Sequence, residues 1–248
     1  MDQKTVLGLI PARGGSKGIL RKNIRALCGR PLLTYTVEAA LKAQSLDRVI
    51  VSTDDSEIAH IAAAAGAETP FFRPPEYSTD TATCILAIKH AIAWLEDNEN
   101  YHPDAVAFLP PTSPLRTAEQ IDGTVNLLWS SGMDSAVTVC PVQDHPYYVY
   151  SIDDNLLLNE LIAVHNKPKR RQELPVYYAQ SQSVMVSLTS YLTICGDSDL
   201  ERNPYSSAGF VIDRESAFDV DTPIDFVILE AIMRQRMGRD DHCHVREE

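Results

Sequence analysis

The sequence predicts one α/β domain with a Rossmann-like, mostly parallel sheet between two layers of helices. Short apolar runs that suit buried strands alternate with longer segments of helical periodicity, which is typical of parallel strands joined by crossover helices. The 248 residues fit one large domain and can bury a core without disulfide bonds. The chain shows neither an internal repeat nor a long linker, so residues 1–248 are expected to form a single domain.

Local signals place the elements of the first half. Three apolar runs of strand length are Val6–Ile10, Arg48–Ser52 and Ala105–Leu109. Helices are expected over Leu32–Lys42, Ser56–Ala65 and Thr83–Glu96. Pro31 suits the start of the first helix, Ser56 can cap the second, and Gly66 can end it.

The second half interrupts this alternation and then resumes it. A helix over Ala118–Trp129 and a strand over Ser135–Val142 continue the pattern, and a strand over Phe210–Asp213 and a helix over Ile224–Arg236 complete it. Between them, the segment from Asp144 to about Val186 is rich in tyrosine, asparagine and polar turns. It also carries a basic cluster, Lys167, Lys169, Arg170 and Arg171. We expect this segment to leave the core as an arm or hairpin.

The composition excludes several classes of protein. Twenty-two basic and 34 acidic residues give a net charge of −12, which disfavours nucleic-acid and anionic-membrane partners. The five cysteines are scattered and form no C-x-x-C pair, so reduced thiols in a cytoplasmic protein are expected. The apolar run at Val6–Ile10 is too short for a signal sequence or a membrane span.

Positive charge is concentrated near the N-terminus of this acidic chain. No acidic residue occurs from Gln3 to Val37, a stretch that holds seven lysines and arginines. Within it, the glycine-rich loop, residues 11–18 (PARGGSKG), directly follows the first expected strand. Glycines let backbone N–H groups approach phosphate oxygens, and Arg13, Lys17 and Lys22 can add charge-assisted bonds. The pattern is neither a Walker A loop nor G-x-G-x-x-G, and a solvated basic face is the alternative.

Three later motifs also follow expected strands or precede expected helices. Arg73 opens a proline-rich loop that continues to Thr83, and residues 110–116 (PPTSPLR) form a stiff loop with hydroxyl groups. Asp219 and Asp221 alternate, so both carboxylates fall on one side of an extended segment. Such a pair suits Mg²⁺, and a simple acidic turn is the alternative.

Three stretches of the chain resemble, in the same order, the motifs of the acylneuraminate cytidylyltransferases: IPARGGSKGILRKN, LPPTSPLR and FDVDTPID. The related CMP-Kdo synthetases are a weaker match. The resemblance implies the fold of the nucleotide-diphospho-sugar transferases and a homodimer in which the arm serves dimerisation. It also implies CTP and a sugar acid as substrates, with Mg²⁺ (or Mn²⁺) as cofactor. The sugar hydroxyl would attack the α-phosphorus of CTP, and pyrophosphate would leave.

The same resemblance implies roles for individual residues. Nucleotide binding is expected of Ala12, Arg13, Gly14, Gly15, Ser16, Lys22, Asn23, Arg73, Asp80 and Ala82. Substrate binding is expected of Thr112, Ser113, Arg116, Arg170, Arg171 and Gln182. The metal is expected on Asp219 and Asp221, and the catalytic residues are Arg13, Lys17, Lys22 and Asp221.

Three positions depart from the sialic acid pattern of this family. Pro110 stands where glutamine is usual, and Gln182 and Met185 stand where glycine and an aromatic residue are common. The sugar acid is therefore left open between a nonulosonic acid and an octulosonic acid. A glycosyltransferase that consumes a nucleotide sugar would also suit the D-x-D pair, and a non-catalytic nucleotide-binding protein would also suit the basic loop. Release of pyrophosphate from CTP would separate the expected activity from both.

Overall fold

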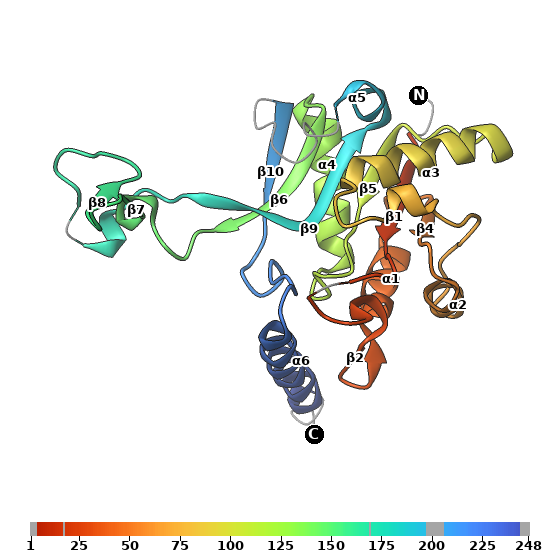
Figure 1. The fold of residues 1–248 in the computed structure, drawn as a ribbon, viewed down its shortest axis with the longest axis horizontal. Helices are drawn as coiled ribbons and strands as arrows, with labels where there is room; N and C mark the ends of the chain where they lie inside the picture. The colour runs from red at the N-terminus through yellow and green to blue at the C-terminus, as the bar shows by residue number, and fades with distance from the viewer. Residues whose placement is uncertain (1–3, 17, 169, 197–205, 244–248) are drawn as a thin grey trace.

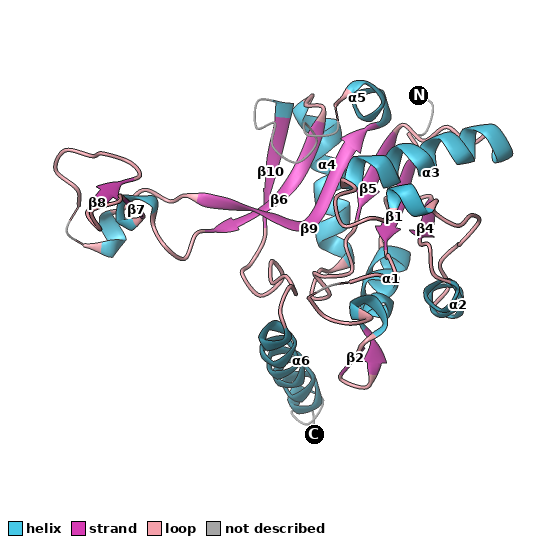
Figure 2. Cartoon of the chain, in the orientation of Figure 1, coloured by secondary structure: helices cyan, strands magenta, loops and turns pink. Residues whose placement is uncertain are grey.

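The computed structural model describes residues 4–16, 18–168, 170–196 and 206–243, and the side chains of all of these except 171 and 237–243. At its centre is a six-stranded sheet in the order β10-β6-β9-β5-β1-β4 (Figures 1 and 2). The strands are β1 (Val6–Pro11), β4 (Arg48–Ser52), β5 (Ala105–Phe108), β6 (Ser135–Pro141), β9 (Tyr178–Leu188) and β10 (Ser207–Val211). All of them run in one direction except β9, which is antiparallel to both of its neighbours. The predicted α/β class and mostly parallel sheet are confirmed, and the sheet is mixed.

The helices are α1 (Leu32–Lys42), α2 (Ser56–Ala64), α3 (Cys84–Glu99), α4 (Ala118–Ser131), α5 (Thr189–Ile194) and α6 (Pro223–Cys243). All of them except α6 cover the two faces of the sheet. Alternation along β1 sends Val6 and Ile10 into the core beneath α1 and α4, and sends Leu7 and Leu9 into the core beneath α3. None of the described helices combines the length and the apolar character needed to cross a bilayer.

A third apolar cluster attaches α6 to the rest of the molecule. Phe226, Leu229 and Met233 lie on one face of α6 and pack in a cluster with Leu32, at the start of α1, and with Val220. Nearby are the short hairpin of β2 (Ala26–Leu27) and β3 (Arg30–Pro31), and the 3-10 turn η1 (Lys22–Ile24). This packing holds the segment before α6 against the end of the sheet.

One local prediction needs correction. The cap of α2 is Asp55 and not Ser56, because the Asp55 carboxylate accepts hydrogen bonds from the N–H groups of Glu57 and Ile58. Gly66 does follow the helix with a positive φ of 100°. Cys28 and Cys140 are free thiols.

The larger correction concerns β9. The sequence placed residues up to about Val186 in the arm, yet Tyr178–Leu188 is an 11-residue strand at the middle of the sheet. Val184 and Val186 are fully buried there, and so is Ser183. The strand was missed because its buried face includes serines and its first residues are exposed, so it does not read as an apolar run.

The remainder of the interruption is an arm, residues 142–177, that projects from the body of the molecule (Figure 1). It contains the turns η3 (Pro146–Tyr148) and η4 (Arg171–Glu173), and a small hairpin of β7 (Tyr150–Ile152) and β8 (Leu158–Glu160). The hairpin displays Ile152, Leu156, Leu157, Leu158 and Leu161, each between 62% and 82% exposed.

Candidate active site

A cavity of about 510 Å³ lies where β1 and β5 end, bounded by the segment after β4 and the segment before α6. Ligands of doubly wound sheets gather at this edge. The cavity brings together many of the residues predicted to form the site: Arg13, Ser16, Lys22, Asn23, Arg73, Asp80, Ala82, Thr112, Gln182, Asp219 and Asp221. These residues come from five separate stretches of the chain, and the fold places them around one space.

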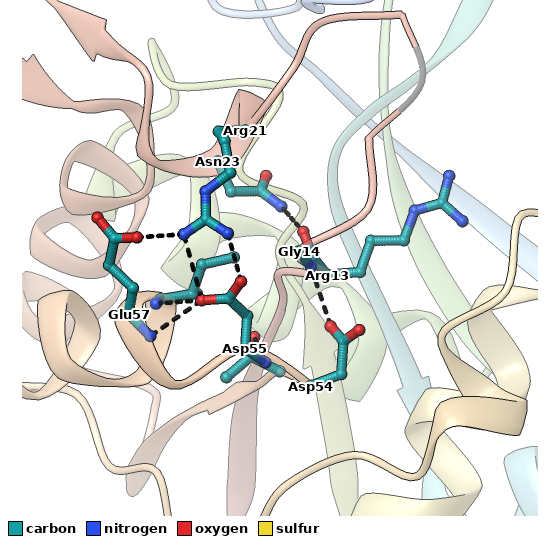
Figure 3. Close-up of polar contacts among 9 residues, drawn as sticks. Arg13, Gly14, Arg21, Asn23, Asp54, Asp55 and Glu57 are labelled. Atoms are coloured by element: carbon teal, nitrogen blue, oxygen red, sulfur yellow. Dashed lines mark hydrogen bonds and ion pairs between the residues drawn. The ribbon is translucent and has the colours of Figure 1, made fainter.

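The glycine-rich loop is tied to the turn after β4 (Figure 3). Ala12 is buried and continues the sheet, since its N–H donates to the carbonyl oxygen of Ser52 at 3.0 Å. The N–H of Gly14 donates to Asp54 Oδ1 at 2.9 Å. Gly15 has open space where a side chain would be. Ala12, Gly14 and Gly15 do not line the cavity, and Lys17 lies outside the described residues.

Arg13 reaches across the cavity to the loop before α3. Its Nη1 donates to the carbonyl oxygen of Thr79 at 2.7 Å, and its Nη2 lies 3.0 Å from Asp80 Oδ1. About a third of the Arg13 side chain is exposed, so a phosphate in the cavity could reach it. Two of the predicted residues, Arg13 and Asp80, are therefore already paired.

Lys22 meets the acidic pair at the other end of the cavity. Its Nζ donates to the carbonyl oxygen of Val220 at 2.8 Å and lies 3.4 Å from Asp221 Oδ1. Val220 is buried in the cluster beneath α6, and its N–H donates to the carbonyl oxygen of Thr112 at 2.9 Å. Because the segment is extended, the neighbouring Asp219 and Asp221 both line the cavity. Asp219 also accepts a bond of 3.3 Å from the hydroxyl of Ser113, which is itself buried away from the cavity.

The acidic pair fits a hard cation that is completed by substrate oxygens. Within the described part of the chain, no group of three or more histidine, cysteine or acidic side chains is placed to hold a metal. Magnesium is commonly held by one or two carboxylates together with water and phosphate. Asp219 and Asp221 meet that requirement only when a phosphate is present.

Arg73 is a buried cation with unused donors. The residue is 6% exposed, and neither Nε nor Nη2 has a hydrogen-bond partner within the described part of the chain. Burial lowers the pKa of the Arg73 guanidinium, and the nearby carboxylate of Asp54 partly opposes this. Unpaired buried donors are costly, and Arg73 lines the cavity, so a ligand with acceptor atoms would satisfy it.

Arg116 is not placed as the sequence predicted. It is 3% exposed and does not line the cavity. Its guanidinium donates to the carbonyl oxygens of Ser183 at 2.6 Å and Pro110 at 2.5 Å, and to the Thr36 hydroxyl at 2.9 Å. Burial lowers the pKa of Arg116 to about 9, an effect that Asp219 opposes. Arg116 thus braces the loop after β5.

A second cavity of about 290 Å³ adjoins the first. The two share Cys84, Phe108, Pro110 and Gln182, and the second adds Gln180, Ser181 and Met185. Sequence reasoning noted Pro110, Gln182 and Met185 as departures from a pattern but missed Cys84, Phe108 and Gln180. The position of Phe108 at the end of β5 was the available signal.

Arg170 belongs to the arm, which projects from the body of the molecule (Figure 1), and it does not line the cavity. Its side chain is 71% exposed, and its Nε is 3.9 Å from Glu173. The side chain of Arg171 and the whole of Lys169 lie outside the described residues. The cavity of this chain is therefore built without the arm.

Comparisons with known proteins agree with this geometry. A family model described as "Cytidylyltransferase" matches residues 7–201. The chain is 31% identical over 231 residues to CMP-N,N'-diacetyllegionaminic acid synthase of Legionella pneumophila, covering 92% of this chain and 96% of that protein. It is 31% identical over 232 residues to N-acylneuraminate cytidylyltransferase of Escherichia coli, covering 93% of this chain and 52% of that protein. The solved structure of CMP:2-keto-3-deoxy-manno-octonic acid synthetase with CTP superimposes with a TM-score of 0.69 at 16% identity, covering 94% of this chain and all of the other.

Proposed function

The chain belongs to the cytidylyltransferase family, and we propose that it transfers CMP from CTP to an N-acylated nonulosonic acid with release of pyrophosphate. The observation that carries this proposal is the meeting of Arg13, Lys22 and Arg73 with Asp219 and Asp221 in one cavity. Three cations suit a triphosphate and a base with acceptor atoms, and the carboxylate pair suits the metal that accompanies phosphates. The class of the acceptor, a nonulosonic acid, is inferred from the names of the relatives.

Each cationic group binds a different part of the nucleotide in this proposal. Arg73 donates from Nε and Nη2 to the carbonyl oxygen and ring nitrogen of cytosine, which are both acceptors. Arg13 and Lys22 face the phosphates and neutralise the charge that grows on the departing pyrophosphate. Ser16 and Asn23 line the same side of the cavity. The role of Lys17 within the loop stays a prediction from the resemblance.

Asp219 and Asp221 would hold Mg²⁺ or Mn²⁺, which when bound supplies positive charge to the α-phosphate and lowers the pKa of a bound hydroxyl. Lys22 lies beside this pair and keeps the carboxylates in place through its bonds to Asp221 and Val220. The sugar hydroxyl attacks the α-phosphorus, a new C–O–P bond forms, and the bond to the pyrophosphate oxygen breaks. Most of the acceleration comes from positioning and from charge stabilisation.

The second cavity is our proposed site for the sugar acid. Phe108, Pro110 and Met185 give it an apolar wall, and Gln180 and Gln182 bring carboxamides. An N-acyl group has a methyl for such a wall and an amide for such carboxamides. An octulosonic acid, which carries a carboxylate and hydroxyl groups but no N-acyl group, would leave the wall without a partner. This observation favours a nonulosonic acid over the octulosonic alternative.

The test is pyrophosphate release from CTP and Mg²⁺ with a panel of acceptors. The panel includes N-acylated nonulosonic acids, one octulosonic acid and a blank without acceptor. We expect kcat/KM to be at least about tenfold higher for the N-acylated acids, because a filled apolar pocket discriminates by this order. Equal turnover of the octulosonic acid contradicts the sugar assignment. Absence of pyrophosphate with every acceptor contradicts the proposed reaction.

We also propose that two copies assemble through the arm. The exposed leucines of the β7–β8 hairpin form an apolar surface that the described part of the chain leaves uncovered. Arg170 stands on the same arm, with its side chain 71% exposed and its Nε 3.9 Å from Glu173. A groove beside the main cavity is lined by Asp144, Asp225 and Arg214, and the carboxylates of Asp144 and Asp225 could meet a second copy's arm. A closed two-fold dimer would use the same surfaces twice.

A mixing experiment tests whether the arm completes the neighbour's site. We expect the double variant Arg170→Ala/Arg171→Ala and the variant Asp221→Asn each to be nearly inactive alone. After subunit exchange at equal amounts, about a quarter of the wild-type sites should be intact, because half of the dimers are mixed and each carries one complete site. Exchange is verified by native mass spectrometry. An active monomer, or no recovery after proven exchange, would show that the arm serves its own chain.

A further inference from the structure

The peptide unit between Arg13 and Gly14 is held from both sides by side chains outside the loop. Its carbonyl oxygen accepts a hydrogen bond from Asn23 Nδ2 at 2.9 Å, and its N–H donates to Asp54 Oδ1 at 2.9 Å (Figure 3). Asn23 is 6% exposed and belongs to η1, so the first anchor is rigid. A planar peptide bonded at both oxygen and nitrogen cannot rotate without losing one of the bonds.

Gly14 is also pressed against the turn after β4. A Cβ atom added at Gly14 would lie 2.7 Å from Asp55 Oδ2, closer than a Cβ atom approaches other heavy atoms. The glycine thus lets the loop backbone reach the two aspartates. The contact joins the ends of β1 and β4 at the edge of the cavity.

Asp55 is fully used by other partners and cannot replace Asp54. Its carboxylate caps α2 and accepts from Arg21 Nη1 at 2.5 Å, while Arg21 also bonds Glu57. Arg21 has a left-handed backbone with φ of 55°, which this ion-pair group stabilises. Figure 3 shows the side chain of Arg13 extending away from the Arg21, Asp55 and Glu57 group. Asp54 is therefore the one acidic residue of the turn that bonds the loop backbone.

We propose that Asp54 is a positioning residue for catalysis. By holding the Gly14 N–H, it fixes the direction in which Arg13 leaves the loop toward Thr79 and Asp80 and into the triphosphate site. The Gly14 amide then remains bonded to Asp54 and is not a phosphate ligand. This inference rests on the proposed function, because it takes Arg13 to act on the phosphates of CTP.

A double-mutant cycle tests the proposal, with Asp54→Ala, Arg13→Ala and the double variant. Asp54→Ala should reduce kcat/KM for CTP about tenfold, the order for a lost bond to a charged group. In the Arg13→Ala background the same change should cost less than about twofold, because the two residues act through one group. Asp54→Asn keeps an acceptor oxygen and should retain most of the activity. Its rescue separates the hydrogen bond from the charge that Asp54 places near Arg73.

The matched control is Asp104→Ala. Asp104 also accepts a hydrogen bond from a backbone N–H, that of Thr5 at 2.8 Å, but at the end of the strands opposite the cavity. The Asp104→Ala variant should leave kcat/KM unchanged. Hydrogen exchange of the Gly14 amide, followed by NMR, should be faster in Asp54→Ala and near wild type in Asp54→Asn and Asp104→Ala.

Three results would overturn the inference: additive losses in the cycle, equal losses in Asp104→Ala, or unchanged exchange at Gly14. The Kd of CTP is also measured by calorimetry for the same variants, because this measurement needs no turnover. A wild-type protein that releases no pyrophosphate would contradict the proposed function alone. An unchanged Kd together with unchanged kcat/KM in Asp54→Ala would contradict the positioning role alone.

Discussion

Replacing Asp221 by asparagine is expected to lower kcat by about a thousandfold or more while the protein stays folded. The change removes one of the two carboxylates proposed to hold the metal in the cavity, and metal coordination there would supply several kcal/mol to the transition state. The Asp221 side chain is 75% exposed, so its loss leaves the core intact and the melting temperature should be nearly unchanged. Steady-state kinetics with a Mg²⁺ titration measures the effect.

The Mg²⁺ titration separates the metal from the ion pair with Lys22. If Asp221 binds the metal, the variant should need a higher Mg²⁺ concentration for half of its residual rate. Asp97→Asn on α3 removes the same charge from an exposed position and should behave as wild type. Wild-type activity in excess chelator, or unaltered kcat in Asp221→Asn, would leave Asp219 and Asp221 as an acidic turn only.

Removing the guanidinium of Arg13 is expected to have the second large effect on activity. Arg13→Ala should lower kcat/KM for CTP by roughly 30-fold to 1000-fold, which corresponds to about 2–4 kcal/mol of lost charge stabilisation. The loss should also weaken product inhibition by pyrophosphate, since the same group would face the departing phosphates. Kinetics in both directions of the reaction measure the two quantities.

Arg30→Ala is the matched control for Arg13. Arg30 lies in the same basic stretch, but it pairs with Glu38 and stacks on Tyr35, outside the cavity. Its replacement should leave kcat/KM unchanged. Loss of activity in both variants would indicate a general effect of the basic segment, and wild-type kinetics in Arg13→Ala would exclude the assigned role.

The fold was predictable wherever one local rule decided the structure. Arg48–Ser52 and Leu32–Lys42 match their expected bounds because an apolar run and a proline start leave little choice. β9 was not predictable in this way, since Ser181 and Ser183 are polar and lie buried at the register shift opposite Val137 and Val139 of β6. Burial of a serine depends on partners far along the chain, which a local pattern does not contain.

The candidate site was likewise predictable only in part. The motifs indicated functional residues at the ends of strands, and the topology of the sheet brings Arg13, Lys22 and Asp221 into one cavity. The motifs could not show that the donors of Arg116 are used within the protein, because that depends on the carbonyl oxygens of Pro110 and Ser183. Nor could they show that Asp54 bonds Gly14. A backbone N–H or carbonyl group can pair with a distant side chain whatever its residue type, so these contacts leave no signal in the sequence.

The central place of β9 governs the order in which this sheet can be completed. β5 and β6 do not pair with each other, because the late strand β9 lies between them. In a nascent chain that has passed residue 141, the edges of β5 and β6 that pair with β9 are therefore both open, and they stay open until Leu188 has left the ribosome. Such edges are the surfaces through which chains aggregate, and pairing between distant segments is slow. Synthesis of the 36 residues of the arm is thus a vulnerable interval for this protein during translation.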